Sequence, residues 1–477
     1  MSRIKKLMEN KFIRGGSFLT VSTILSQVIS FIFINIYVVN IMPAVQLGNF
    51  GLYLRTLSIL NIIGTVNLSS SIMRGKFEFE NEFDSFFKSI IIVGIVFSAI
   101  SSSVFMVAII IIKELGVFET SYLSIPIIVF MGIHSIMLFL YNCNMNKLTA
   151  TYKHKEFAII DVLKTLITVT TVIIFFFVFN WDTYIERVAG TVLTMVGFSI
   201  FFLIKNRKTK FKFKKEYLIF ATTYSIPLIL HSLSTTILNY FDSFVLKGYE
   251  VSGHLDAGTQ GVYTYAYSIV MIISTIWTIL NKLWTPWFFE KMREKDTEKI
   301  KKVAEQYVVI FSFLFFAFLM AVPEMKFFLK NKSFSHAFIY IPIAAAGFYF
   351  LFLYSFLSNT EFYHKNTKYF SLGAIIAGVS NIVLNLIFIP IYGDIAAAIT
   401  TLISYVILFL YHILINDFIL KNKIFSYTMY LKGIILMGLS VFTYYSLLEY
   451  TLIRWGILMV TTGVIYIIYR RKISWLN

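Results

Sequence analysis

Apolar runs long enough to cross a bilayer fill most of this chain, and they constrain its fold more than any other feature. A transmembrane helix needs about 20 successive apolar residues, and only helices and closed barrels satisfy every backbone polar group inside lipid. Of the 477 residues, 58% are hydrophobic and 14% are charged, whereas a soluble domain has about 25% charged residues. The chain is therefore predicted to be an all-α integral membrane protein.

Polar breaks divide the apolar sequence into about fourteen predicted transmembrane helices. They cover residues 15–40, 49–72, 87–112, 122–142, 157–179, 184–204, 217–241, 262–284, 303–323, 337–358, 370–390, 395–416, 430–448 and 454–469. The first apolar run follows a basic segment and has no clear small-residue cleavage site. It is therefore expected to remain as an anchor and not to be removed as a signal peptide.

Lysine and arginine are distributed very unevenly between the two predicted sides of the membrane. With the N-terminus placed in the cytoplasm, the cytoplasmic segments hold 32 of the 42 basic residues and the outside segments hold 7. Basic loops stay inside, so this distribution favours the assumed orientation, with both termini in the cytoplasm. The net charge of +17 then meets anionic lipid headgroups, and no nucleic-acid partner is expected.

The two halves of the chain resemble each other. The pattern Gly-x-x-Gly-x-Tyr occurs at residues 48–53 and at residues 258–263, each time near the start of a predicted helix. Six predicted helices separate the copies, so both run in the same direction and the repeat is parallel. Such a repeat predicts two six-helix lobes in a V-shape around a cavity. The expected parts are an N-terminal lobe, a basic cytoplasmic linker, a C-terminal lobe and two further helices, over residues 1–204, 205–216, 217–416 and 417–477.

Four segments carry a resemblance to a known family. They are LGNFGLYLRTLSI (47–59), NYFDSFVL (239–246), GVYTYAYSI (261–269) and NIVLNLIFIPIYGDIAAA (381–398). In their order and spacing the chain resembles the polysaccharide-export flippases, the Wzx or O-antigen transporters of the multidrug/oligosaccharidyl-lipid/polysaccharide (MOP) superfamily. The resemblance implies a MATE-like fold, with the last two helices as an addition to the two lobes.

The resemblance also implies a function. Flippases of this type move oligosaccharide repeat units, linked by pyrophosphate to undecaprenol, from the inner to the outer leaflet of the bacterial cytoplasmic (inner) membrane. They work by alternating access, for synthesis of O-antigen, lipopolysaccharide, capsule or exopolysaccharide, and coupling to an ion gradient as an antiporter is suspected. The expected partners are the lipid-linked oligosaccharide, membrane lipids and the polysaccharide polymerase and chain-length machinery.

Two cations lie inside predicted helices. Arg55 is about six residues from the predicted outer end of its helix, or roughly 9 Å. Either its long stem lifts the guanidinium to the interface, or the guanidinium lines the cavity and binds phosphate oxygens in pairs. Lys164 lies nearer the cytoplasmic side, with Asp161 one turn earlier on the same face. Either the charges of Lys164 and Asp161 neutralise each other, or Lys164 binds the diphosphate while Asp161 takes part in ion coupling.

Three further titratable residues lie within or beside the predicted helices. His134 and His231 lie near the middles of theirs, where each is either a neutral histidine bonded across helices or a proton carrier. Asp242 follows the predicted end of another helix, as a structural cap or as a counter-charge to the cavity cations. All three are candidates for ion coupling.

Amides and tyrosines add uncharged polar groups to the predicted helices. Asn381 and Asn385 are four residues apart on one helix face, and Asn61 and Tyr265 lie in the second helix of each predicted lobe. Hydrogen bonding between helices explains part of this set. A hydrated cavity that accommodates sugar explains the set as a whole, and Tyr265 could stack on a sugar ring there.

No catalytic motif accompanies these residues. The sequence contains no P-loop, no zinc-ligand spacing and one cysteine, so no cofactor, no metal and no enzymatic activity are expected. The first alternative is a cation-coupled multidrug exporter of the MATE type, which would share the two lobes. The second is a polysaccharide polymerase or O-antigen ligase, and the short predicted outside segments argue against it.

Overall fold

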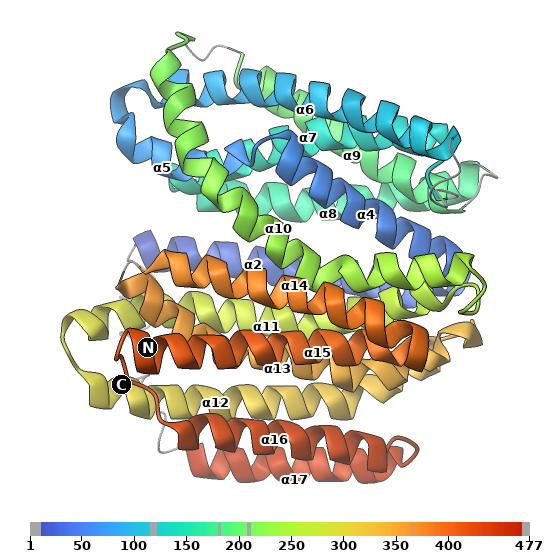
Figure 1. Ribbon diagram of the computed structural model, residues 1–477, viewed down its shortest axis with the longest axis vertical. Helices are drawn as coiled ribbons and strands as arrows, with labels where there is room; N and C mark the ends of the chain where they lie inside the picture. The colour runs from blue at the N-terminus through green and yellow to red at the C-terminus, as the bar shows by residue number, and fades with distance from the viewer. Residues whose placement is uncertain (1–10, 115–121, 180–182, 208–210, 365, 470–477) are drawn as a thin grey trace. The chain divides into compact units, whose positions relative to one another are not determined.

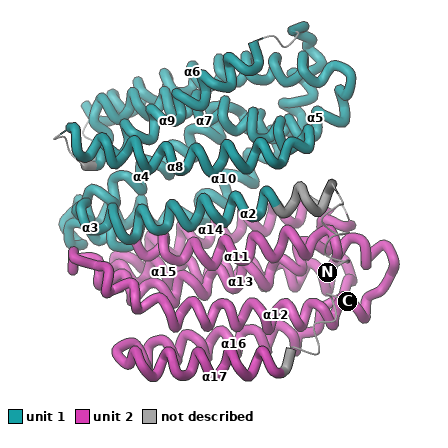
Figure 2. The backbone as a smooth tube through the Cα atoms, turned by 180° about the vertical axis from the view of Figure 1, so that it is seen from behind, with its two compact units in different colours: residues 1–264 teal, residues 265–477 magenta. Residues whose placement is uncertain are grey.

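A computed structural model describes residues 11–114, 122–179, 183–207, 211–364 and 366–469. These residues form helices and no strand, as the apolar runs predict (Figure 1). Contacts divide the chain into two compact units, residues 1–264 and 265–477 (Figure 2). The division lies after the predicted linker Lys205–Glu216, because the helix that follows this linker packs with helices of the first unit.

Among the described residues, unit 1 contains nine α-helices of its own. They are α2 (Lys11–Ile32), α3 (Val39–Ile41), α4 (Ala44–Gly64), α5 (Ser71–Glu78), α6 (Phe83–Glu114), α7 (Ile125–Ala150), α8 (His154–Val178), α9 (Thr183–Lys205) and α10 (Lys215–Val251). Short helical turns η1 (Phe33–Val38), η2 (Leu68–Ser70) and η3 (Glu80–Glu82) connect some of them. The next helix, α11 (Thr259–Arg293), begins in unit 1 and continues in unit 2.

Unit 2 contains the remaining helices. They are α12 (Thr297–Ala321), α13 (Ala337–Tyr363), α14 (Thr367–Tyr392), α15 (Ile395–Leu414), α16 (Tyr427–Ser446) and α17 (Thr451–Tyr469), with turns η4 (Val322–Phe328), η5 (Lys332–His336) and η6 (Ile415–Ile419). Helix α15 packs against both α13 and α14, and α12 packs against α16. The most buried helix is α13, which is apolar all round and so needs neighbours on every side.

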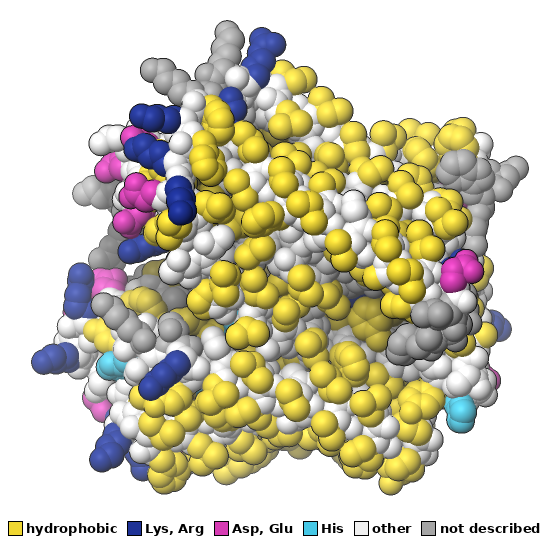
Figure 3. All heavy atoms as spheres, turned by 45° about the horizontal axis from the view of Figure 1, so that its top comes forward, with side chains coloured by type: hydrophobic (Ala, Val, Ile, Leu, Met, Phe, Trp, Pro, Cys, Tyr) yellow, Lys and Arg dark blue, Asp and Glu magenta, His cyan; other side chains and the backbone are white. Residues whose placement is uncertain are grey.

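Helices lie at all fourteen predicted places, but fewer of them qualify as membrane spans. Eleven described helices are long and apolar enough to cross a membrane, or twelve if the bent pair α4 and α5 counts as one span. Helix α16 is not among them, and α17 is a shorter apolar helix. The predicted number of fourteen spans is therefore not confirmed. Hydrophobic side chains cover the helix sides seen in Figure 3, while many charged side chains gather at their ends.

The second predicted helix, residues 49–72, is wrong as a single helix. Helix α4 ends at Gly64, and the chain bends by 70° before it continues through η2 and α5. The break occurs because Val66 and Asn67 adopt positive φ angles of 52° and 51°, a conformation outside the α-helix. The Thr65 hydroxyl also donates to the Asn61 carbonyl at 2.7 Å, at the end of the helical ladder.

The predicted helix 217–241 is too short. Helix α10 continues for three more turns to Val251, and Asp242 therefore lies inside the helix and not at its end. An ion pair between Lys247 and Glu250, at 3.0 Å and three residues apart, supports the added turns.

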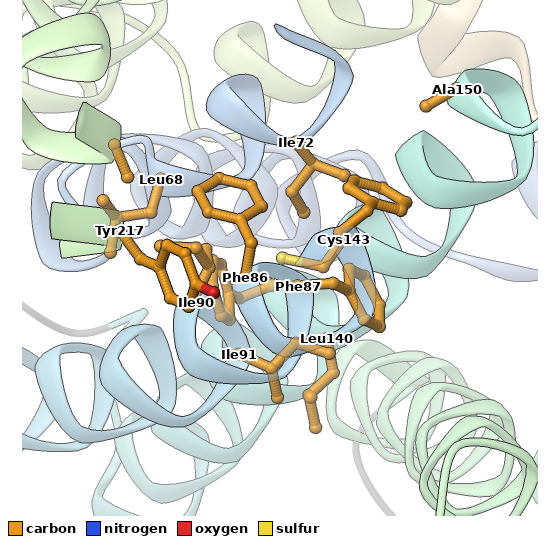
Figure 4. Packing of buried hydrophobic residues seen from close by; sticks show 13 residues of the cluster. Leu68, Ile72, Phe86, Phe87, Ile90, Ile91, Leu140, Cys143, Ala150 and Tyr217 are labelled. Atoms are coloured by element: carbon orange, nitrogen blue, oxygen red, sulfur yellow. The ribbon is translucent and has the colours of Figure 1, made fainter. Parts of the chain in front are cut away.

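A core of aromatic and aliphatic side chains holds α5, α6, α7 and α10 together in unit 1. The buried Cys143 lies within this core, beside Phe86 and Phe87 (Figure 4). Helix α10 also packs against α4. These contacts fix the helices that carry the polar residues described next.

Candidate functional site

Arg55 lies on α4, and its guanidinium is buried against residues of α10 and α11. The residue is 6% exposed, and the Tyr240 ring centre lies 5.4 Å from its guanidinium carbon. Nη1 donates to Thr264 Oγ1 at 3.4 Å. In the amide orientation that satisfies its neighbours, Gln260 accepts from Nη1 at 3.0 Å and donates to the Gly48 carbonyl at 3.1 Å. The guanidinium is thus held by neutral groups and by an aromatic face.

Asp242 supplies a negative charge near Arg55. It is 1% exposed and interacts electrostatically with Arg55. Its Oδ2 accepts from the Tyr263 hydroxyl at 2.5 Å, and its Oδ1 accepts from the Ser243 backbone N–H at 2.7 Å. Hydroxyl and backbone donors thus partner the buried carboxylate, and its role as a counter-charge to Arg55 stays a prediction. The arginine cluster is defined as Arg55, Asp242, Gln260, Tyr263 and Thr264.

The two copies of the Gly-x-x-Gly-x-Tyr pattern pack against each other and build the arginine cluster. A Cβ atom on Gly261 would lie 1.8 Å from the Ala44 carbonyl oxygen, and one on Gly48 would lie 2.9 Å from the Gly261 backbone nitrogen. A Cβ on Gly51 would lie 2.9 Å from the Thr264 side chain. Small residues let helix backbones approach closely. The beginnings of α4 and α11 therefore cross where only glycine fits, and this crossing brings Thr264 to Arg55.

A second polar group lies where α8 meets α2 and α7. Lys164 Nζ lies 5.8 Å from the centre of the Tyr141 ring and interacts electrostatically with Asp161. Asp161 Oδ2 accepts from the Ser26 hydroxyl of α2 at 3.0 Å. The predicted pairing of Lys164 with Asp161 on one helix face therefore extends to two neighbouring helices. The lysine cluster is defined as Ser26, Tyr141, Asp161 and Lys164.

His134 links α4 to α7 beside the lysine cluster. Its Nδ1 lies 2.9 Å from the Tyr53 hydroxyl, and both residues are buried. Lys164 acts electrostatically on His134. Asn61, two turns along α4 from Tyr53, donates to the Ser135 carbonyl at 3.0 Å. One face of α4 thus presents polar groups to α7, while Arg55 points toward α10 and α11.

The break between α4 and α5 faces α10 through polar side chains. The half-buried His231 lies on α10. In the same part of that helix, Ser232 accepts from Asn67 Nδ2 at 3.4 Å, and Ser225 Oγ lies 3.3 Å from Ser70 Oγ. Irregular backbone at membrane depth is tolerated where it is buried in protein or lines water. The break is therefore packed against His231's helix by hydroxyl and amide groups.

Asn381 and Asn385 lie inside unit 2, between α14 and α15. Both are 0% exposed. Asn381 Nδ2 donates to Thr401 Oγ1 at 3.1 Å, and Asn385 Nδ2 donates to Asn381 Oδ1 at 2.9 Å. The Thr400 hydroxyl donates to Asn385 Oδ1. These contacts form a hydrogen-bonded link between two helices, as expected for amides in membrane proteins.

Tyr265 lies at the start of unit 2 and is 0% exposed. Its ring meets the Phe334 ring edge to face, with centres 5.2 Å apart. Its hydroxyl has no hydrogen-bond partner among residues that the structure describes. The Tyr265 ring is thus packed inside the unit, and its hydroxyl oxygen is the polar atom that stays unsatisfied there.

A cavity of about 720 Å³ opens in unit 1 between η3, α6, α7 and α9. Lysines and acids line it together. Within it, Lys147 pairs with Asp84 at 2.8 Å, and at its edge Lys214 pairs with Glu82 at 2.5 Å. Because the acids offset these lysines, the cavity lacks the uniform positive charge of an anion site.

The structure brings most of the predicted unit 1 residues into two groups. Arg55 and Asp242 share one group, and Lys164, Asp161 and His134 lie together in the other. Sequence reasoning missed Gln260 and Thr264. The repeat itself was the available signal, because two small-residue faces predict a close helix crossing. Within the described ranges, no three His, Cys, Asp or Glu side chains gather as a metal site.

A family model described as polysaccharide biosynthesis protein matches residues 12–292, which is more than half of the chain. The chain is 23% identical over 447 residues to the uncharacterized membrane protein MJ1068 of Methanocaldococcus jannaschii, covering 87% of this chain and 86% of that protein.

Solved structures of transporters share the fold. A structure described as the lipid II flippase MurJ, in an inward closed conformation, has a TM-score of 0.70 at 19% identity, covering 95% of this chain and 98% of that chain. An inward-facing multidrug resistance MATE transporter of the MOP superfamily has a TM-score of 0.59 at 14% identity, covering 85% and 96%. A MOP superfamily transporter from Pyrococcus furiosus has a TM-score of 0.59 at 16% identity, covering 84% and 95%.

Proposed function

Because the chain belongs to the polysaccharide biosynthesis protein family, we propose that it is a flippase for undecaprenyl-pyrophosphate-linked oligosaccharide repeat units. It moves them from the inner to the outer leaflet by alternating access, for O-antigen, capsule or exopolysaccharide synthesis. The likeness to a solved lipid II flippase over nearly the whole chain supports this proposal. Both proteins would then move a polar headgroup on a lipid through the membrane.

The observation that carries the proposal is the buried guanidinium of Arg55. A charged residue at the bilayer centre costs about 2.5–3.5 kcal/mol on insertion scales, so such residues are usually functional. A guanidinium binds two phosphate oxygens at once through parallel N–H donors. The neutral Gln260 and Thr264 hold Arg55 without cancelling its charge, which favours exchange of these partners for a pyrophosphate.

Lys164 is the second proposed phosphate contact. It shares its electrostatic environment with Asp161 and His134. Uptake of a proton by Asp161 would leave the ammonium of Lys164 available to the pyrophosphate, and this exchange links substrate binding to an ion. His231 and Asp242 remain further proposals for ion coupling. Asn61, Asn381, Asn385 and Tyr265 remain proposals for contacts with the sugar, although the two amides in unit 2 already bond to threonines.

The proposed location is the bacterial cytoplasmic membrane, with both termini in the cytoplasm. The distribution of lysine and arginine supports this orientation. There the protein would receive its substrate from glycosyltransferases and deliver it to a polymerase with its chain-length machinery.

Deletion of the gene tests the proposal. We expect undecaprenyl-pyrophosphate-linked repeat units to accumulate on the cytoplasmic leaflet, because their synthesis continues while their export stops. Mass spectrometry of lipid extracts and staining of surface glycan would measure both effects. Normal surface glycan without accumulation would contradict the proposal.

A multidrug exporter is the second candidate, and the MATE-like fold favours it. Such a protein would expel apolar cations. The same deletion strain would then become sensitive to cationic dyes, while its lipid-linked oligosaccharides would stay at the normal level.

A further inference from the structure

Three polar side chains meet inside unit 2, and none of them has a role in the proposed function. They are Glu361 near the end of α13, His412 near the end of α15 and Asn416 in η6. Each of these side chains is 0% exposed. His412 Nδ1 lies 2.6 Å from Glu361 Oε1, and Asn416 Nδ2 donates to the same oxygen at 2.8 Å. A fully buried acid beside a histidine is costly unless its charge is compensated.

An irregular helix places Asn416 in this group. The α-helix α15 gives way to a π-helical segment, η6, at Ile415. Such segments are rare and are frequent at functional sites. Asn416 Nδ2 also donates to the His412 carbonyl at 2.9 Å. The amide thus ties the irregular turn to the carboxylate.

Each member of the group keeps one polar atom unused. Within the described part of the chain, no hydrogen-bond partner is found for Glu361 Oε2, His412 Nε2 or Asn416 Oδ1. Buried polar atoms are normally satisfied. Because three such atoms belong to one hydrogen-bonded group, the group is expected to bind an ion or a proton that satisfies them.

Glu361 forms its ion pair with His412 in the described part of the chain. Among described residues, no lysine or arginine lies within 4.0 Å of its carboxylate. On α13 the Tyr354 ring centre lies 4.7 Å from that of His412, and the hydroxyls of Tyr354 and Tyr411 interact electrostatically with Glu361.

The other elements packed around the pair, α14, η6 and α16, also carry tyrosines and an acid. Tyr369 on α14 interacts with Tyr411, and a Cβ on Gly373 of α14 would lie 2.5 Å from His412 Nε2. Asp417 of η6 accepts from Tyr427 at the start of α16. Tyrosines and one further acid are thus the titratable neighbours of the pair among the described residues, and an added cation would neutralise it.

We propose that Glu361 and His412 form a proton-binding site, with Asn416 as a residue that positions the carboxylate. With one proton on Nδ1, donated to Oε1, the pair has a net charge of −1. A second proton, on His412 Nε2 or Glu361 Oε2, makes the pair neutral. Because the buried pair disfavours a net charge, it would bind this second proton, and water that reached the ends of α13 and α15 would release it.

A proton suits this group better than a metal ion does. Hard cations take six or more oxygen ligands, whereas this group offers two uncommitted oxygens and an imidazole nitrogen. The site binds a proton whatever the cargo of the protein is. Its use as the coupling ion of transport rests on the proposed function.

The pH dependence of unfolding tests the site without any cargo. Between about pH 8 and pH 9 a free histidine and a free glutamate are deprotonated, so under the proposal the unfolded chain binds one proton fewer than the folded protein. Stability of the full-length protein in detergent micelles should therefore fall as pH rises. E361Q has the shape of the protonated acid and leaves His412 neutral, so its slope should be smaller by about one proton.

Asp417→Asn is the matched control, because it removes a carboxylate from the same π-helical turn outside the pair. It should keep the wild-type slope. Equal slopes for wild type and E361Q would overturn the proposal, and so would stabilisation that depends on sodium concentration and not on pH. Chemical modification of wild-type Glu361 is a second test, needed if E361Q does not fold. Dicyclohexylcarbodiimide reacts with protonated acids in apolar surroundings. Its modification of Glu361 should therefore decrease as pH rises. Absence of that modification at every pH would likewise overturn the proposal.

Discussion

Arg55 shows how a single residue within an apolar helix can be kept charged. Its guanidinium is surrounded by an amide, a hydroxyl and an aromatic ring, and Asp242 acts on it from the neighbouring helix. These contacts lower the cost of burial without forming a closed ion pair around Nη1. The proposed exchange of these partners for a phosphate rests on this arrangement.

Substitution of Arg55 tests this role at the residue scale. Arg55→Ala should lower export of lipid-linked oligosaccharide by about tenfold or more, because a hydrogen bond to a charged group contributes about 1.5–3 kcal/mol. Arg55→Lys should keep part of the activity, since it keeps the charge and loses the paired donors. Surface glycan in complemented deletion cells is the measurement.

Arg74→Ala is the control, because Arg74 is an exposed arginine on α5. It should restore surface glycan as well as the wild type does. Full activity of the Arg55→Ala variant, at a normal protein level, would exclude Arg55 from substrate binding.

Sequence reasoning at this scale found the charged residues but not all of their partners. The spacing of Asp161 and Lys164 predicts their pairing, because neighbours on one helix face are local. Gln260 and His412 were missed, because their partners are brought to them by helices distant in sequence. Glu361 lies three residues beyond the predicted end of its helix and so was not recognised as a buried acid.

At the scale of elements, the crossing of α4 and α11 is set by glycine. The sequence repeat predicts that the two copies of the pattern are equivalent, and the structure shows in addition that they touch. Helix positions could be predicted because apolar length alone marks them. The break after Gly64 was not predicted, although Gly64 and Asn67 are residue types common at helix ends, because the predicted apolar run continues past them.

Gly261→Ala tests the crossing. Its Cβ would lie 1.8 Å from the backbone oxygen of Ala44, and a backbone atom cannot move aside as a flexible side chain does. We expect a loss of about 1–3 kcal/mol in the free energy of unfolding. Thermal unfolding of the purified protein in micelles would measure it.

Gly197→Ala is the matched control on α9, where an added Cβ meets nothing within 4 Å. This change should be neutral or stabilising by up to about 1 kcal/mol, because alanine favours the helix. Equal stability of the two variants would mean that the helices do not cross closely.

At the scale of the whole molecule, the chain joins a transporter fold to polar groups buried among helices that are long and apolar enough to cross a membrane. The family and the fold are established by a match over more than half of the chain and by solved transporters of the same architecture. Charge distribution predicts orientation without any structure, because it reflects membrane insertion and not packing. The identity of the cargo depends on the residues that face it, and this requires transport to be measured.

Transport in proteoliposomes is the most direct test of the flippase proposal. Purified protein is reconstituted with labelled undecaprenyl-pyrophosphate-linked oligosaccharide, and a membrane-impermeant glycosidase reports the fraction of label in the outer leaflet over time. We expect rapid transfer between leaflets with the wild-type protein and at least about tenfold slower transfer with Arg55→Ala. Transfer no faster than in protein-free vesicles, under conditions where the protein is folded, would contradict the proposed function.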